Sequence, residues 1–561
     1  MFLREKRIGG RTYLYLVESV REGGKPKQRI VATLGRKETV LEHGDLDRLV
    51  RSIGRYASRS IVLSLLDGGA VPQPTARRIG AALLFERLWR ETGGRAVLDD
   101  LLADRQFAFP VERAVFLTVL HRLMVSGSDR SAEKWRRDQR IDGTDALKLH
   151  HLYRAMAWLG EALPPGDQAG RTPFAPRCIK DDVEERLFAR RRDLFSDLSV
   201  AFMDTSSLYF EGQGGETLGK RGYSKDHRPD LYQMVVGVIM DQAGRPVCCE
   251  MWPGNTADVR TLIPVVDRLR RRFGIQQVCV VADRGMISEA TIAALEDRGL
   301  EYLLGVRERS STEAREVVLN DAGPFVPLVV RRTCGKETDL EAKEVKVGRR
   351  RYIVCRNPAE QARDAARRDQ IVASLRERLK AGDKALIGNN GYRRYLQTPA
   401  TDHFVLDATR IAEDARFDGV HVLRTNTRLT PLQAMLRYRE LIKVERLFRS
   451  AKTLLETRPI FHQTDAAIRG HVFCSFLALI LAKALEDRLA AHRVTAEWAD
   501  ILADIDRLQE IEVDQDGKRF RLRTPTTGCA GKVFQLAGVA LPPNIQDLTA
   551  PRPGLPTAPR L

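Results

Sequence analysis

The amino-acid sequence predicts a mixed α/β fold for the middle of the chain, on two observations. Residues 195–307 show three strand-like segments followed by a helix, a strand, a helix and a strand. The segment VCVVA at 278–282 is apolar throughout and lies between two helical segments, which is typical of a central strand in a parallel sheet. This order of elements predicts the first part of an RNase H-like core.

Two predicted regions precede this core. Residues 1–60 carry 14 Lys or Arg against 7 Asp or Glu, and the stretches 11–20 and 28–34, joined by GGKPK, predict a basic β-hairpin. Residues 61–177 contain segments with apolar residues three and four apart, so we expect helices there. Their short polar connections fit helix-turn-helix DNA binding and a plain helical bundle equally well. The Pro/Gly-rich stretch 163–177 is expected to be a linker.

Three predicted regions follow the first part of the core. Residues 308–425 are expected to form a β-rich insertion with one long charged helix. The core pattern resumes over 426–500 with a long basic helix (431–456) and a buried helix. The C-terminal segment, 501–561, ends in a Pro-rich stretch that we expect to be disordered. The prediction is therefore an α/β protein with an RNase H-like core, a β-rich insertion before its last functional helix, and a β-hairpin and helical DNA-binding region in front.

The overall charge points to a polyanionic partner. The 561 residues carry a formal net charge of +18, with an isoelectric point near 9.7. A basic protein of this kind gains affinity for nucleic acid because each neutralised phosphate releases condensed counterions. A generally arginine-rich composition is the alternative explanation, so charge favours nucleic acid without proving it.

The remaining composition excludes several classes of protein. None of the eight cysteines forms a C-x-x-C pair, so neither a zinc site nor a disulfide framework is predicted. No apolar segment follows the basic N-terminus, as a signal peptide would require. The most apolar stretch, 472–485, is too short to span a bilayer. We therefore expect a cytoplasmic, nucleoid-associated protein with reduced thiols and no membrane partner.

Three acidic residues are placed where they suggest metal-dependent chemistry. Asp204 lies inside the apolar segment SVAFMDTSS and Asp283 ends QVCVVAD, so the predicted topology brings the two carboxylates together on neighbouring strands. Glu445, on the long basic helix, is the natural third ligand. Oxygen ligands of this kind suit two Mg²⁺ or Mn²⁺ ions, which could promote in-line attack on a phosphodiester. The alternative is that Asp204 caps a turn and Asp283 begins the following helix.

The helix around Glu445 strengthens the functional interpretation. Tyr438, Glu445 and Lys452 are seven residues apart, so on one helix they lie nearly in line and face the same groove. Other basic residues surround them on this helix, namely Arg439, Lys443 and Arg449. A solvated face with aromatic core contacts is the alternative. We expect Tyr438, Lys452 and these three basic side chains to contact DNA, together with Lys225 and Arg228 in the loop after Asp204.

The sequence resembles the DDE insertion-sequence transposases of the branch marked by a Y-R-E-K signature, the superfamily of insertion sequence four. The resemblance covers nearly the whole chain. It is carried by MDTSS around Asp204, PGNTADVRTL (253–262), VVADRGMIS around Asp283, FDGVHVLRTNT (417–427) and YRELIKVERLFRSAKTLLETRPIFH (438–462). It implies that Asp204, Asp283 and Glu445 are the catalytic carboxylates and that Tyr438 and Lys452 contact the DNA end.

One position departs from the signature. The signature expects an arginine three residues after the tyrosine, and this chain has Leu441. Arg439 or Lys443 could supply the charge, because both lie within one helical turn of this position. The assignment of the three carboxylates does not depend on which residue does so.

The resemblance implies cut-and-paste movement of the protein's own element. The partners would be double-stranded DNA, namely the terminal inverted repeats and the target, with a homodimer in the synaptic complex. A metal-dependent nuclease that cuts without joining would use the same carboxylates. A DNA-binding protein derived from a transposase would have no reason to keep all three.

Relatives in this branch are expected to free the element through a DNA hairpin, with an aromatic residue of the insertion stacking on a flipped base. All five tryptophans lie outside residues 284–444. If hairpins form, a tyrosine of the insertion must serve, and the first candidates are Tyr352, Tyr392 and Tyr395.

Overall fold

The computed structural model describes most of the chain, which divides into two compact units. Unit 1 comprises Met1–Leu83, Asp138–Arg140 and Ala496–Leu561, and unit 2 comprises Leu84–Arg137 and Ile141–Thr495. The described residues are 2–22, 25–54, 75–171, 175–191, 200–224, 228–274, 279–283, 286, 288–306, 311–331, 337–348, 350–380, 394–400, 403–441, 459–515 and 518–548.

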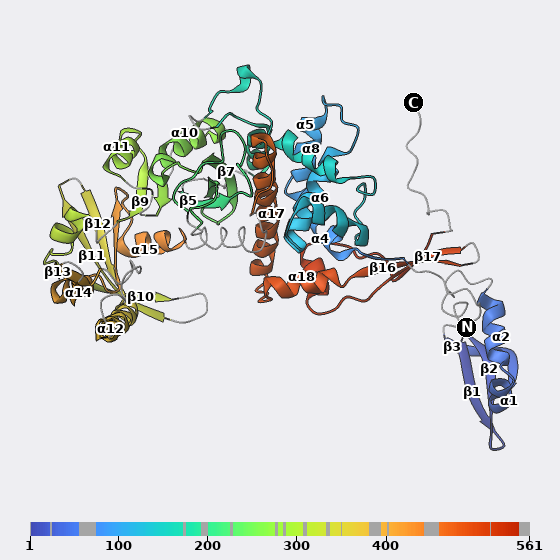
Figure 1. Cartoon of the computed structure of the whole chain (residues 1–561). Helices are drawn as coiled ribbons and strands as arrows, with labels where there is room; N and C mark the ends of the chain where they lie inside the picture. Colours follow the sequence, from blue (N-terminus) through green and yellow to red (C-terminus); the bar gives the residue numbers. More distant parts are fainter. Residues whose placement is uncertain are drawn as a thin grey trace. The chain divides into compact units, whose positions relative to one another are not determined.

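The N-terminal part of unit 1 is a three-stranded antiparallel sheet followed by two helices (Figure 1). The predicted hairpin is present as its second and third strands, and the first strand was missed because its residues FLREKRI are mostly charged and all exposed. Leu14, Val17 and Val40 form the small buried centre. The elements are β1 (Phe2–Ile8), β2 (Arg11–Glu22), β3 (Lys25–Arg36), α1 (Lys37–Glu42) and α2 (Asp45–Gly54).

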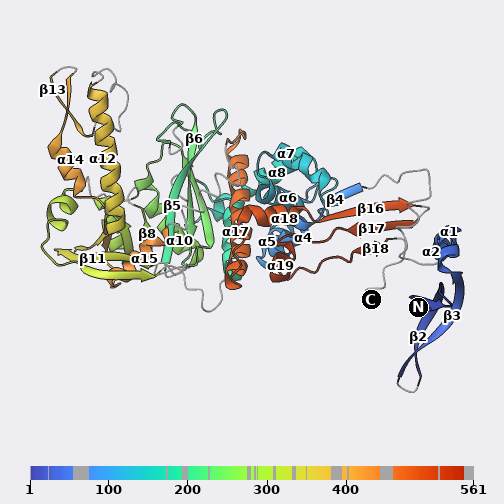
Figure 2. The ribbon, with the colours of Figure 1, turned by 90° about the horizontal axis from the view of Figure 1, so that it is seen from below.

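The rest of unit 1 joins residues that are far apart in the sequence. A four-stranded sheet has the order β18-β17-β16-β4, so a strand before residue 80 pairs with β16 and joins three strands that lie after residue 508 (Figure 2). Between β16 and β17, carboxylates pair with arginines, as Arg521 does with the buried Glu510 and the partly buried Glu512. The elements are β4 (Thr75–Arg78), α18 (Trp498–Asp506), β16 (Gln509–Gln515), β17 (Lys518–Arg523), α19 (Ala530–Leu536) and β18 (Ile545–Asp547).

Unit 2 is built on a nine-stranded mixed sheet with the order β10-β11-β12-β15-β9-β8-β5-β6-β7. The predicted α/β fold and element order of its first part are confirmed. β8 lies between β5 and β9 and is parallel to both, as its uninterrupted apolar sequence predicted. The elements are β5 (Val200–Tyr209), β6 (Gln233–Met240), β7 (Pro246–Pro253), α10 (Leu262–Phe273), β8 (Cys279–Ala282), α11 (Glu289–Asp297) and β9 (Glu301–Gly305).

One face of this sheet is covered by α10 and α11. Met203, Ala282 and Leu304 pack there in a single apolar cluster with Val265 of α10 and Ile292 of α11. Because side chains alternate along a strand, the residues that follow these three on β5, β8 and β9 point to the opposite face. That opposite face carries the residues of interest.

The segment predicted as a β-rich insertion extends the same sheet. β12 pairs with β15, and β15 pairs with β9, so the added strands continue the core sheet beyond β9. A long helix and a short hairpin form a smaller cluster around Leu375, Tyr395 and Leu396. The elements are β10 (Val326–Arg331), β11 (Glu337–Val347), β12 (Arg350–Arg356), α12 (Pro358–Lys380), β13 (Leu396–Ala400), β14 (His403–Leu406), α14 (Ala408–Ala415) and β15 (Val420–Thr425).

The helices before the sheet pack around a long helix from the other end of the unit. In Figure 1, α17 (Asp465–Ala491) stands between the sheet and the earlier helices, and it contacts α6, α8 and β7. The predicted linker 163–177 is a loop within this unit, where the side chain of Gln168 bonds to the backbone of Leu163 and Arg177. The helices are α4 (Gly80–Glu91), α5 (Gly94–Leu102), α6 (Val111–Met124), α7 (Asp129–Trp135), α8 (Leu149–Leu159) and α9 (Ile179–Arg191).

The apolar stretch 472–485 is part of α17, and the prediction that it is too short to cross a membrane was wrong about length. The helix has 27 residues, enough in length and composition to span a bilayer, because it continues at both ends of the apolar stretch. Its most apolar window is 83% buried within the protein. α17 is therefore the central core helix of unit 2.

Candidate active site

Asp204 and Asp283 lie side by side at the same level of the sheet. Met203 of β5 is paired in register with Ala282 of β8 on the parallel ladder. Extending this register by one residue places Asp204 beside Asp283, and both side chains point away from the α10–α11 face. The sequence prediction that these strands are neighbours is correct. Asp204 is partly buried, whereas Asp283, just beyond the end of β8, is exposed.

The structural alternatives for these two aspartates do not fit the observed contacts. Asp204 Oδ1 accepts a 2.7 Å hydrogen bond from the backbone N–H of Thr205, which lies inside β5 and not in a turn. Asp283 does not cap α11, because Ser288 does so by accepting a hydrogen bond from the backbone N–H of Thr291. Neither carboxylate is therefore explained as a helix or turn cap.

The two carboxylates open into one cavity of about 340 Å³. Its walls come from the core strands, from the added strands β11, β12 and β15, and from α12 and α15. The lining residues are Asp204, Asp283, Leu340, Cys355, Arg356, Asn357, Glu360, His421, Leu423, Met435, Tyr438, Arg439 and Leu441. The cavity thus joins the predicted carboxylates to the beginning of the predicted functional helix.

Tyr438 reaches the carboxylates from α15 (Pro431–Arg439). This helix begins with a capping box, in which Thr430 accepts a hydrogen bond from the backbone N–H of Gln433 and the Gln433 side chain accepts one in return. At its other end the hydroxyl of Tyr438 donates to Asp283 Oδ1 over 3.4 Å. α15 ends at Arg439, so the uninterrupted helix predicted over 431–456 breaks there.

Most of the other predicted site residues lie outside the described part of the chain. These are Glu445, Lys443, Arg449, Lys452 and Lys225. Leu441 is buried and lines the cavity, so an apolar side chain stands where the signature expects arginine. Arg439 is exposed and lines the same cavity. Of the two basic residues considered as replacements, Arg439 is the one that the structure describes, and it lies at the site.

Arg228 has partners of its own in the described structure. Its guanidinium bonds to Asp230 at 3.0 and 2.9 Å and lies over the Tyr209 ring. The hydrogen bond to Asp230 raises the pKa of Arg228. A phosphate contact by this side chain would therefore have to compete with Asp230.

The segment predicted as an insertion (308–425) supplies polar side chains to the cavity, and the sequence did not indicate these side chains as site residues. His421 of β15 lies 3.2 Å from Glu360 of α12, measured from Nε2 to Oε2. Asn357, just before α12, accepts hydrogen bonds from the backbone N–H groups of Ala359 and Glu360. Alternation along β15 was readable in the sequence, but nothing there indicated that this strand would pair beside β9.

Two of the three tyrosines considered as stacking platforms, Tyr352 and Tyr395, are buried. Tyr352 is 2% exposed and belongs to a buried apolar cluster, and burial raises the pKa of its hydroxyl to about 12. Tyr395 is 1% exposed, with its hydroxyl bonded to Asp414. Tyr392 lies outside the described residues. Without rearrangement, neither Tyr352 nor Tyr395 can stack on a flipped base.

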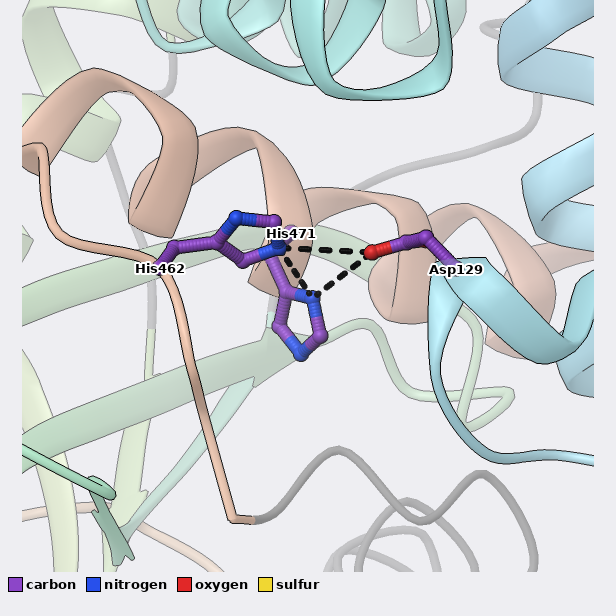
Figure 3. A group of neighbouring side chains, drawn as sticks. All are labelled: Asp129, His462 and His471. Atoms are coloured by element: carbon purple, nitrogen blue, oxygen red, sulfur yellow. Dashed lines mark hydrogen bonds and ion pairs between the residues drawn. The ribbon is translucent and has the colours of Figure 1, made fainter. Parts of the chain in front are cut away.

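A second group of potential metal ligands lies elsewhere in unit 2. Asp129 of α7, His462 and His471 of α17 converge within 4.8 Å of one another (Figure 3). His462 Nε2 is 3.3 Å from Asp129 Oδ2 and 3.2 Å from His471 Nδ1. The chain segment before α17 is thereby held against the N-terminus of α7.

A guanidinium already occupies the position that a cation would take in this group. Arg122 Nη2 lies 2.9 Å from His471 Nδ1 and 3.7 Å from Asp129 Oδ1, and its other nitrogen donates to the His471 carbonyl. Burial and the charge of Arg122 lower the pKa of His471 to about 4. Burial alone would raise the pKa of Asp129, but the two histidines and Arg122 lower it well below its usual range. This buried group is complete as an ion pair between Arg122 and Asp129, with a neutral His471 beside it.

The Asp204–Asp283 pair fits a divalent metal better. It offers carboxylate oxygens, which Mg²⁺ and Mn²⁺ prefer, and it opens into a cavity. Two neighbouring carboxylates repel each other unless a cation lies between them. The residues present therefore suit a hard divalent ion.

Comparison with known proteins gives two matches, which between them cover the basic N-terminal region and most of unit 2. Residues 195–481, more than half of the chain, match the family model of the transposase DDE domain. Residues 3–64 match that of the IS1634 family transposase, N-terminal domain. No curated protein is significantly similar in sequence to the chain.

Proposed function

Because the chain belongs to the transposases with a DDE domain, we propose that it cleaves DNA at the ends of its own insertion element and joins these ends to target DNA. The observation that carries the proposal is the pair Asp204 and Asp283, which share one level of the sheet and one cavity. A DDE domain implies a site of this kind, with divalent metal ions as cofactors.

The proposed ligands are Asp204, Asp283 and Glu445. The first is held on β5 and the second just past the end of the buried strand β8. Glu445 is assigned by the sequence resemblance and lies outside the described residues. Bound Mg²⁺ or Mn²⁺, two ions in the usual arrangement, would activate water or a 3′-hydroxyl and stabilise the leaving oxygen.

The other residues of the site would orient the carboxylates and the DNA. The hydroxyl of Tyr438 donates to Asp283 Oδ1 and so limits rotation of this carboxylate. Arg439 lines the cavity and would contact a phosphate near the scissile bond. Lys443, Arg449, Lys452, Lys225 and Arg228 are proposed as further backbone contacts, with Arg228 exchanging Asp230 for phosphate.

The partners follow from the same proposal. We infer that the protein binds the double-stranded ends of its element and a target duplex, that two copies meet in the synaptic complex, and that the reaction occurs at the nucleoid. A net charge of +18 favours each DNA contact. Six phosphate contacts would make the logarithm of the binding constant fall with the logarithm of salt concentration at a slope of about −5.

The experiment is a combined cleavage and strand-transfer assay on a labelled duplex that carries the element end. With Mg²⁺, the wild-type protein should release a 3′-hydroxyl end and then produce a longer strand joined to target DNA. Chelation should stop both steps. Cleavage without any joined product would mean a nuclease, and binding without cleavage would mean a DNA-binding protein derived from a transposase.

A further inference from the structure

Asp204 and Asp283 lie at the same level of two adjacent parallel strands, and a glycine lies at this level on the next parallel strand. Ala282 of β8 is paired in register with Leu304 of β9 on the parallel ladder. The next residues along three adjacent parallel strands are therefore Asp204, Asp283 and Gly305. Gly305 is buried and ends β9. A side chain at this position would point to the same face as the two carboxylates.

Backbone conformation does not explain the glycine. Gly305 is not among the residues with positive φ, so an alanine could adopt its backbone angles. Its backbone is also part of the sheet, in register with Leu423 of β15. Glycine within a strand costs stability, and such a position commonly marks the close approach of another group.

The approaching group is the side chain of Tyr438. A Cβ atom at Gly305 would overlap the hydroxyl oxygen of Tyr438 and would lie 2.9 Å from its Cζ atom, closer than real Cβ contacts. The same hydroxyl donates to Asp283 Oδ1. The space left by the missing side chain therefore holds the tyrosine hydroxyl beside the neighbouring carboxylate.

We propose that Gly305 is a positioning residue of the active site, which acts through Tyr438 by leaving room for its hydroxyl against Asp283. The proposal rests on the function proposed above for Asp283. α15 packs on β9, so any side chain at 305 must displace either the ring of Tyr438 or the end of this helix. With the hydroxyl fixed on Oδ1, the other lone pairs of Asp283 stay oriented for a metal ion.

The test is a double-mutant cycle with Gly305→Ala, Tyr438→Phe and the double variant. If Gly305 acts through the hydroxyl, each single variant should slow cleavage of the element end by about 10-fold, the usual worth of one hydrogen bond to a charged group. The double variant should be no slower than Tyr438→Phe alone, because the displaced hydroxyl is already absent. Effects that multiply to about 100-fold in the double variant would overturn the proposal.

Mn²⁺ binding provides a readout that does not depend on turnover. Titration of the protein with Mn²⁺, followed by the electron paramagnetic resonance signal of free Mn²⁺, should show equal weakening in all three variants. A purely structural role for Gly305 would leave Mn²⁺ binding unchanged, and that result would contradict the proposal.

Gly237→Ala is the matched control, because it introduces a Cβ atom 2.8 Å from the Trp252 ring in another strand of the same sheet. In the variant that combines Gly237→Ala with Tyr438→Phe, the fold-reductions in cleavage rate caused by the two substitutions should multiply. Gly305→Ala can also be compared by its melting temperature. If it lowers this temperature, the double variant with Tyr438→Phe should melt higher than Gly305→Ala alone, because removing the hydroxyl relieves its overlap with the new Cβ atom. A double variant that melts lower than Gly305→Ala alone would count against the proposal.

Failure of this inference can be told apart from failure of the proposed function. An Asp283→Asn variant that cleaves normally would remove Asp283 from the reaction and with it the proposed function. An inactive Asp283→Asn variant combined with multiplicative effects at Gly305 and Tyr438 would leave the function standing and reject the positioning role.

Discussion

Two places in unit 2 gather the side chains that commonly bind metal ions, and they differ in what balances their charge. At the end of β8, Asp283 stands beside Asp204 and faces a cavity of about 340 Å³. Between α7 and α17, Asp129 meets His462 and His471, with Arg122 already among them. The first place presents carboxylate oxygens to a cavity, and the second contains a buried guanidinium.

The comparison shows that ligand-type residues are not by themselves a metal site. At Asp129 the electrostatic cost of a buried carboxylate is offset by a buried guanidinium, and adding a divalent ion would leave an uncompensated positive charge. At Asp204 and Asp283 a cation bound between the carboxylates would reduce their mutual repulsion. The Asp129 group stabilises the fold, whereas the Asp204–Asp283 pair is the one that we propose as the metal site.

The largest expected effect is the loss of DNA cleavage when Asp204 or Asp283 is substituted. Asp204→Asn or Asp283→Asn should reduce strand cleavage by at least about 1000-fold, because an amide cannot replace a carboxylate as a metal ligand in this chemistry. DNA-end binding, measured by gel shift, should stay near wild type because it depends on basic residues. A variant with near wild-type cleavage in Mg²⁺ would exclude that aspartate from the site.

At the group of Asp129, His462 and His471, substitutions should mainly affect the stability of the fold. Arg122→Met leaves Asp129 buried without its guanidinium partner and should lower the free energy of unfolding by about 3–5 kcal/mol. Arg130→Met, at an exposed position on α7 next to Asp129, is the matched control and should change it by less than about 0.5 kcal/mol. Equal denaturation midpoints for the two variants would show that Arg122 does not balance Asp129.

A smaller effect should follow from pH. The pKa of His471 is lowered to about 4 in the folded protein by burial and by Arg122, whereas an unfolded histidine titrates near 6.5. The unfolded chain therefore binds the extra proton as pH falls from about 6.5 to 4, and stability present at neutral pH is lost in that window.

When the pH falls from 7 to 5, proton uptake by His471 in the unfolded chain should alone lower the free energy of unfolding by about 2 kcal/mol. Comparing urea unfolding of the wild type with that of His471→Asn at both pH values isolates this contribution. The variant should lose less stability on acidification, and an identical loss in both proteins would show that His471 titrates normally.

The smallest expected effect is that of added zinc. Zn²⁺ prefers nitrogen and carboxylate ligands such as those of Asp129, His462 and His471, but Arg122 already donates to the histidine nitrogen that would bind it. Equimolar Zn²⁺ should therefore leave the melting temperature of the Asp204→Asn variant unchanged. A clear rise that disappears in His462→Ala would make this group a metal site after all.

The sequence was informative where local pattern and burial agree. An apolar strand that ends in an aspartate, as at Asp283, predicted the central position of β8 in the sheet, and the strand order brought Asp204 next to Asp283. Tyr438 was found from its spacing and reaches Asp283 as a member of α15. These predictions depend on periodicity and on the cost of burying charge, which are local properties.

Other features depend on contacts between distant segments and could not be predicted. Nothing in FLREKRI indicates the first strand of the N-terminal sheet, since no residue in it is buried. The pairing of β4 with β16 joins residues more than 400 positions apart, and the register of β15 beside β9 brings His421 to the cavity. Gly305 gives no signal until the tyrosine that approaches it has been placed.

The central claim is that a divalent metal ion binds at Asp204 and Asp283, and cleavage of the polypeptide by bound iron tests it most directly. Fe²⁺ replaces Mg²⁺ at oxygen sites, and with ascorbate and peroxide it cuts the backbone next to its ligands, at positions that mass spectrometry can map. Our account predicts cuts next to residues 204 and 283, suppressed by excess Mg²⁺ and absent from Asp283→Asn. Cuts next to residues 129, 462 and 471 with none at the two aspartates would contradict it.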